Sequence, residues 1–146
     1  MIIQELSNAG ASPSLEMMLR FAGQRQQILA HNIANIDTPN FQGKDVDPKE
    51  FQRVLGEAID KRRAKNGGAF GELEMESTRQ IETDKSGNLR LNPSTATDGV
   101  LFHDRNQRDI ERMMQDLVEN ASVYRVAADL LRQQRAQVLG AISQRV

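Results

Sequence analysis

The sequence predicts a mainly α-helical protein whose N-terminal and C-terminal helices pack as an antiparallel coiled-coil layer, with a small, partly β or irregular insert between them. Apolar residues recur at seven-residue intervals near both ends of the chain, and the stretch between them has glycine-rich turns and short alternating segments. We therefore divide the chain into two helical halves, residues 1–40 and 104–146, and a flexible insert, residues 41–103.

The N-terminal helix is expected to begin with Ser12 as its N-cap and Pro13 at its first position, where the missing N–H of proline costs nothing. Apolar residues then recur every seven positions: Leu15, Ala22, Leu29 and Ile36. This spacing is typical of a coiled-coil seam. Pro39 disfavours the helical conformation of the residue before it, so we expect the helix to end near Asp37.

Two asparagines lie three residues apart at the end of this helix, and Thr-Pro follows them. Asn32 and Asn35 share a helix face at this spacing. Asparagine is a poor interior helix residue because its amide competes for backbone hydrogen bonds. We interpret the pair as amides that set the register or contact backbone, and a frayed, capped helix end is the alternative. Thr38 and Pro39 are expected to direct Phe41 towards the base of the insert.

The insert is expected to contain a short helix and a hairpin. Residues 47–65 carry apolar side chains at helical spacing. Residues 72–76 alternate with period two, residues 88–91 offer a short partner strand, and residues 85–88 supply the turn. Two short strands are marginally stable alone. We therefore expect the insert to become ordered only against its neighbours.

The C-terminal helix is expected to begin at a capping box formed by Asp104 and Gln107. One apolar row follows at strict seven-residue intervals: Ile110, Leu117, Tyr124, Leu131 and Val138. Companion rows run beside it, one through Met113, Ala127 and Ala141 and one through Met114, Ala121, Ala128 and Ile142. This helix would span roughly 55–60 Å and the first roughly 35 Å, which leaves about 20 Å of seam uncovered in one hairpin. An uncovered apolar stripe of this size indicates an interaction surface.

Composition excludes several classes of function. The chain has 19 basic and 20 acidic residues, so it has no electrostatic footprint for nucleic acid or for an anionic membrane surface. No apolar run approaches the length of a membrane span. The first ten residues contain no Lys or Arg, and we expect no cleaved signal peptide. Without cysteine there is no disulfide, no thiol nucleophile and no Cys-ligated zinc site.

Catalytic chemistry has little support in the sequence, and we predict no enzyme activity and no cofactor. The two histidines, His31 and His103, have no third ligand at metal-like spacing and are expected to be solvated or packed. Glu72, Glu74 and Glu76 alternate, as on the solvent side of a half-buried strand. A small metal-dependent hydrolase that uses Glu72, Glu74 or His103 is the catalytic alternative.

The segment from His31 to Phe41 resembles the N-terminal signature of the bacterial flagellar axial proteins, the family of the rod and the hook. In that signature an asparagine-rich helix end leads into Thr-Pro-Gly-Tyr. The resemblance covers two regions, residues 24–47 and 98–142. Asn40 stands in the place of the glycine, and asparagine tolerates the left-handed conformation better than other non-glycine residues. Phe41 keeps the ring of the family's tyrosine without its hydroxyl.

The resemblance implies a structural subunit of the proximal flagellar rod that connects the MS-ring and export gate to the rest of the rod. It also implies export by the type III apparatus and polymerisation by helix packing in the periplasm. The implied partners are copies of the chain itself, other rod proteins, the rod-base protein FliE and the MS-ring. The candidate assembly residues are Asn32, Ile33, Asn35, Thr38, Pro39, Phe41, Ile110, Leu117, Tyr124, Leu131 and Val138. A cytoplasmic helical-hairpin adaptor or export chaperone would use the same seams and is the alternative.

Overall fold

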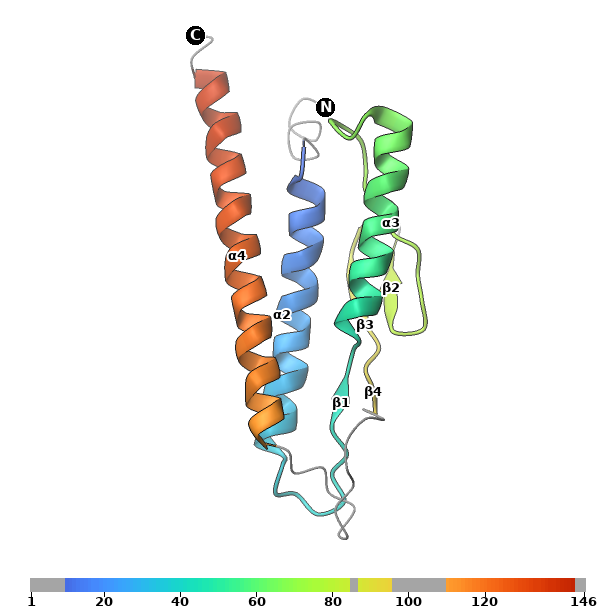
Figure 1. Cartoon of the computed structure of the whole chain (residues 1–146), viewed down its shortest axis with the longest axis vertical. Helices are drawn as coiled ribbons and strands as arrows, with labels where there is room; N and C mark the ends of the chain where they lie inside the picture. Colours follow the sequence, from blue (N-terminus) through green and yellow to red (C-terminus); the bar gives the residue numbers. More distant parts are fainter. Residues whose placement is uncertain (1–9, 85–86, 96–109, 144–146) are drawn as a thin grey trace.

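A computed structural model describes residues 10–84, 87–95 and 110–143 of the chain (Figure 1). Its helices are α2 (Ser12–Ala34), α3 (Pro48–Asn66) and α4 (Ile110–Ser143). Its strands are β1 (Lys44–Asp45), β2 (Ile81–Thr83), β3 (Leu89–Leu91) and β4 (Ser94–Thr95). The predicted class, mainly α with a small β-containing insert, is confirmed. The predicted capping box of Asp104 and Gln107 lies outside the described residues, as does His103.

The helix α2 lies between α4 on one side and the insert on the other (Figure 1). The helix α4 runs antiparallel to α2, as two contacts establish. Near the start of α2, Arg135 Nη2 lies 2.8 Å from Glu16 Oε1. Further along α2, the side-chain amide of Asn120 donates to the carbonyl oxygen of Ala22 at 2.8 Å. The predicted antiparallel helix pair is therefore present.

The face of α4 that packs against α2 is not centred on the row of side chains that the sequence analysis predicted for it. Leu131 of that row is buried, but Ile110 and Tyr124 are 47% and 45% exposed. The buried positions of α4 are centred on the companion row and are Met113, Asn120, Ala127 and Leu131. Fully buried alanines let the two backbones approach closely, and the larger side chains are displaced to the rims.

The ends of α2 differ by a few residues from the predicted ones. Ala11 is the N-cap and makes no side-chain capping bond, whereas Ser12, the predicted cap, is the first helical residue and is buried. The helix ends at Ala34 and not near Asp37, because Asn35 takes the C-cap position and its side-chain amide donates to the carbonyl of His31 at 2.8 Å. Beyond it, Asn40 adopts a left-handed conformation with a φ of 60°, which this residue tolerates.

The helix α3 follows the prediction closely, because both of its ends carry a local stop signal. Asp47 caps it, and its carboxylate accepts a hydrogen bond from the backbone N–H of Lys49 at 2.9 Å. Gly67 ends it in a left-handed conformation, and its N–H donates to the carbonyl of Arg63 at 2.9 Å.

The hairpin has the predicted second strand but a different first strand. β2 pairs antiparallel with β3, with Ile81 opposite Leu91. Residues 72–76, the predicted first strand, form no strand. Their alternation packs the segment against α3 instead: Leu73 and Met75 are buried, while the glutamates between and beside them reach lysines of α3. A second antiparallel pair, β1 with β4, was not predicted.

The hydrophobic core lies between the insert and α2. Ten of its twelve buried residues come from the insert: Val46, Phe51, Val54, Leu55, Ala58, Leu73, Met75, Ile81, Leu89 and Leu91. Met17 and Phe21 of α2 supply the remaining two. The rings of Phe21 and Phe51 stack with their centroids 4.0 Å apart. The insert therefore builds its core against α2, the neighbouring element in the same chain. Among the described residues, no helix is long and apolar enough to cross a membrane.

The ring stack between α2 and α3 generates the first prediction. Phe51→Ala should lower the free energy of unfolding by about 3–5 kcal/mol, because it leaves a cavity in the core. Phe70→Ala is the matched control, since Phe70 is 59% exposed and its loss should change stability by less than about 0.5 kcal/mol. Urea unfolding of the two variants measures both values. Equal effects would show that the insert does not pack on α2.

Candidate assembly surface

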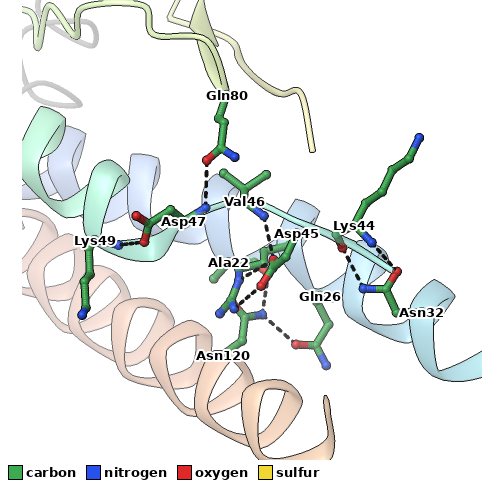
Figure 2. A network of polar contacts seen from close by, with 11 residues as sticks. Ala22, Gln26, Asn32, Lys44, Asp45, Val46, Asp47, Lys49, Gln80 and Asn120 are labelled. Carbon is green, nitrogen blue, oxygen red and sulfur yellow. Dashed lines mark hydrogen bonds and ion pairs between the residues drawn. The ribbon is translucent and has the colours of Figure 1, made fainter. Parts of the chain in front are cut away.

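The first asparagine of the sequence motif joins α2 to the first strand of the insert. Asn32 is buried, and its side-chain N–H donates to the carbonyl of Lys44 at 2.7 Å. The backbone N–H of Lys44 donates in return to Asn32 Oδ1 at 3.2 Å. Figure 2 shows this pair of bonds at the β1 end of the polar network. Both polar groups of one strand residue are satisfied by one amide, which is the backbone contact that the sequence predicted.

An ion pair stabilises the same strand about two turns of α2 earlier. Arg25 Nε lies 2.9 Å from Asp45 Oδ1, and Arg25 Nη2 lies 2.6 Å from Asp45 Oδ2, so the contact is bidentate. Asp45 Oδ1 also accepts the N–H of Val46 at 2.8 Å. The Arg25 side chain is buried. Sequence reasoning missed this pair, because no local pattern relates residues twenty positions apart.

The second asparagine of the motif organises the turn that leaves α2. Asn35 Nδ2 donates to the carbonyl of His31, and Asn35 Oδ1 accepts from the hydroxyl of Thr38 at 3.5 Å. The ring of Phe41 lies edge-on to the imidazole of His31, with centroids 5.8 Å apart. Phe41 therefore packs back on α2, and it also lines a hollow with Leu91 and Pro93 of the insert. Thr38 and Pro39 are exposed, and Ile33 is half-buried.

A buried amide also lies in the seam between α2 and α4. The side-chain N–H groups of Asn120 donate to the carbonyl of Ala22 and to Gln26 Oε1, each at 2.8 Å (Figure 2). A polar residue in an otherwise apolar seam specifies register, because other alignments leave its polar atoms unpaired. The signal was present in the sequence, since Asn120 lies midway between Met113 and Ala127 at seven-residue spacing.

Acidic side chains of α4 line a hollow beside this seam. Asp116 and Glu119 face the α3–α4 groove, a cavity of about 690 Å³ that lies over α2 and is also lined by Met18, Gly56, Ile59 and Val123. Partial burial raises the pKa of the Asp116 carboxyl above its ordinary value, against the opposing effect of Arg25. Ionisation of Asp116 is thus less favourable in the folded chain than in the unfolded one.

The exposed apolar surface of the described residues is concentrated on α4. Nine of its large hydrophobic side chains are exposed: Ile110, Met114, Val118, Val123, Tyr124, Val126, Leu130, Leu139 and Ile142. Of the predicted row, Leu117 and Val138 are half-buried and Leu131 is buried against α2. The structure thus divides the predicted assembly residues between the seam within the chain and the free face of α4.

The geometry offers no support for a metal centre. Within residues 10–84, 87–95 and 110–143, no three His, Asp or Glu side chains are grouped as metal ligands. Glu76 pairs with Lys61, and Glu74 lies 3.3 Å from Lys65. These carboxylates are engaged by α3 and do not converge.

Comparison with known proteins agrees with the motif at the end of α2. A family model described as "Flagella basal body rod protein" matches residues 22–42. The matched segment includes both asparagines that contact backbone, Asn32 and Asn35, and the turn that follows them.

Relatives that match two thirds or more of the chain extend the similarity beyond that segment. The flagellar basal body rod protein FlgB of Borrelia hermsii is 33% identical over 104 residues, which cover 68% of this chain and 71% of the relative. FlgB of Escherichia coli K12 is 30% identical over 119 residues, or 77% of this chain and 78% of the relative. FlgB of Proteus mirabilis HI4320 is 27% identical over 126 residues, or 86% and 88%.

The contact between Asn32 and β1 generates the second prediction. Asn32→Ala leaves both backbone groups of Lys44 without their partner and should lower the free energy of unfolding by about 1–3 kcal/mol. Hydrogen exchange at the Lys44 amide should accelerate. Asn35→Ala, which removes only bonds within the helix end and its turn, is the control and should leave that amide protected. Unchanged exchange in Asn32→Ala would contradict the proposed contact.

The partly buried carboxyl on α4 generates the third prediction. Because the pKa of Asp116 is higher in the folded chain than its ordinary value, ionisation of this group destabilises the fold as the pH rises from the ordinary pKa through the raised one. Asp116→Asn should therefore increase the free energy of unfolding at pH 7, and the increase should vanish below the ordinary carboxyl pKa. Asp129→Asn removes an exposed carboxylate from the same helix and controls for net charge. Stabilisation by Asp116→Asn that persists unchanged at low pH would contradict this account.

Proposed function

The chain belongs to the FlgB family of flagellar basal body rod proteins, and we propose that it builds the proximal end of the rod by helix packing. It is a structural rod subunit, and its place is the flagellar basal body. The proposal adds its position in the rod and the surface through which it assembles. We further propose that it makes and breaks no covalent bond, in keeping with the structural role of its relatives.

The observation that carries the proposal is the exposed apolar face of α4. Exposed apolar patches of this extent mark interaction surfaces. A chain that acted alone would be expected to bury such side chains. α2 and the insert cover only one face of α4, so Val118, 65% exposed, has no apolar neighbour within the described part of the chain that buries it. In a polymer, neighbouring subunits would bury these side chains.

Assembly by helix packing also accounts for the shape of the molecule. A helix of 34 residues spans about 51 Å and one of 23 residues about 35 Å, so α4 extends past the start of α2 (Figure 1). One end of the molecule therefore differs from the other. Contacts between unlike surfaces do not close into a dimer and can propagate as a helical assembly.

The proposed partners are those that surround the base of a rod. They are copies of this chain, other rod proteins, the rod-base protein FliE and the MS-ring. We propose that the type III export apparatus delivers the chain. The turn of Asn35, Thr38, Pro39 and Phe41 lies at the end of the helix pair opposite the projecting part of α4, where it is available to a neighbouring subunit.

The cytoplasmic adaptor or export chaperone stays the alternative, and location separates it from the rod subunit. An adaptor would be recovered in the soluble fraction with a bound client. A rod subunit would copurify with basal bodies after detergent extraction and high salt. Recovery of the chain only in the soluble fraction would contradict the proposed function.

The free face of α4 generates the fourth prediction. Val118→Asp places a charge where a neighbouring subunit would bury it, so swimming should be lost while the purified variant keeps its helicity and thermal stability. Asn66→Asp adds the same charge at an exposed polar position of α3, away from the free face of α4, and should swim normally. Motility in soft agar and immunoblots of purified basal bodies measure the two outcomes. Normal swimming of Val118→Asp would show that this face is not buried in the rod.

A further inference from the structure

The projecting end of α4 is apolar and largely exposed. We call residues 136–143 the overhang, because α4 continues there past the start of α2 (Figure 1). Leu139 is 67% exposed, and Ile142 is 45% exposed. Six of the eight overhang residues are apolar or glycine, and none is charged. A helix end that faces only water is usually polar, so this surface indicates a packing partner that carries few charges.

The contacts between α2 and α4 set an antiparallel register that can be followed to the overhang. Asn120 contacts the carbonyl of Ala22 and the side chain of Gln26. Two heptads further along α4, Gln134 lies so close to Gly10 that a Cβ on this glycine would be 2.7 Å from its side-chain nitrogen. Gly10 itself lies two heptads before the midpoint of Ala22 and Gln26. One step back along the chain from α2 therefore matches about one step forward along α4.

Gly10 is held in this place from the side of α3 as well. Its N–H donates to the carbonyl of Ala69 at 2.9 Å, and its carbonyl accepts a hydrogen bond from Arg62 Nη1 at 2.6 Å. Its φ of 57° lies in the left-handed region, which glycine adopts at little cost. The residues before Gly10 are therefore joined to the structure at a fixed point, next to the place where the overhang begins.

These preceding residues, 1–9, are the N-terminal segment, and their sequence has the pattern of a short amphipathic helix. They lie outside the described residues. Ile2, Leu6 and Ala9 follow one another at spacings of four and three, so they share one face of a helix. Polar side chains fall mostly on the opposite side, and Glu5 is the only charged side chain. An apolar face with few charges is what the overhang requires of a partner.

The N-terminal segment also has the length and the attachment point that are needed to cover the overhang. A helix of nine residues spans about 14 Å, and so does the part of α4 that follows Gln134. The register continued past Gly10 places Leu6 opposite Val138. Because the segment is joined to Gly10, its effective concentration at this surface is in the millimolar range, which favours it over a partner that is free in solution.

We propose that the N-terminal segment packs as a short helix on the overhang of its own chain, with Leu6 against Val138 and Ile2 against Ile142. The apolar seam of α4 then continues beyond the start of α2 to the end of the helix. This inference goes beyond the proposed function, because it concerns the single chain and holds in a subunit that has not assembled. It leaves the outer face of α4 as the apolar surface for other subunits.

The chain contains no cysteine, so disulfide formation tests this contact directly. The full chain is purified with Leu6→Cys and Val138→Cys and is oxidised at low protein concentration. The matched control combines Leu6→Cys with Ala136→Cys, which moves the second cysteine by two residues to the opposite face of α4. Because a disulfide needs Cα atoms about 4.4–6.8 Å apart, we expect the intramolecular link to form about tenfold faster in the first variant than in the control.

Two results of this experiment would overturn the proposal. Equal rates of intramolecular linkage in the two variants would show that the segment does not lie on this face of the overhang. Linked dimers that increase with protein concentration, in place of the intramolecular link, would assign the overhang to a second copy of the chain.

Hydrogen exchange gives an independent measurement in a chain without cysteine. Leu6→Asp places a charge against the apolar overhang and should release the segment. The amides of Val138 and Ile142 should then exchange about tenfold faster, because an uncovered helix end opens locally. Gln4→Asp adds the same charge to the polar face of the segment and should leave both amides unchanged.

The Ala127 amide reports on the fold of both variants. Ala127 is fully buried in the seam between α2 and α4, so its exchange should be the same in Leu6→Asp, in Gln4→Asp and in the unsubstituted chain. Unchanged exchange at Val138 in Leu6→Asp would overturn the proposed contact.

Discussion

The fold depends on α2 burying two opposite faces at the same time. Phe21 points to the insert and stacks on Phe51, while the next residue, Ala22, is fully buried on the side of α4. Both neighbours depend on this helix for their position, because α2 lies between α3 and α4 (Figure 1). A change in the rotation of α2 about its axis would disturb both interfaces at once. The sequence of α2 is therefore constrained on nearly all sides, whereas α4 is constrained on one.

Polar contacts set the register between neighbouring elements, which apolar packing alone would not determine. A seam of alanine and other small side chains can shift by a heptad with little loss of contact, because every register buries similar groups. Asn120 removes this freedom between α2 and α4, since only one alignment gives it the carbonyl of Ala22 and the side chain of Gln26. Asn32 and the Arg25–Asp45 pair do the same between α2 and β1. The register is thus set on both sides of α2 by groups whose burial is unfavourable without a partner.

The features that could be predicted from the sequence are those with a local cause. The helix α3 has its cap at Asp47 and its stop at Gly67, and the turn before β3 contains a glycine, so their positions follow from residues a few places apart. The pairing of β1 with β4 joins segments about fifty residues apart and has no local signature. Residues 72–76 have the alternation of a strand, yet their glutamates find lysines on α3 and their backbone does not pair. Heptad spacing predicted that α4 packs through an apolar seam. It did not predict which face of the helix forms the seam, because rows at neighbouring positions are equally apolar.

The difference between α2, which is packed on two faces, and α4, which is packed on one, bears on how such a subunit can polymerise. Ordering flexible segments on association opposes binding, so a surface held in place beforehand loses less entropy when a partner arrives. The contacts of Asn120 and Arg135 hold α4 against α2 along much of its length and leave its outer face directed away from the chain. The apolar side chains on that face are then presented in a fixed array along a single rigid helix. A polymer of such subunits gains its specificity from the polar contacts inside each chain and its cohesion from the apolar face between chains.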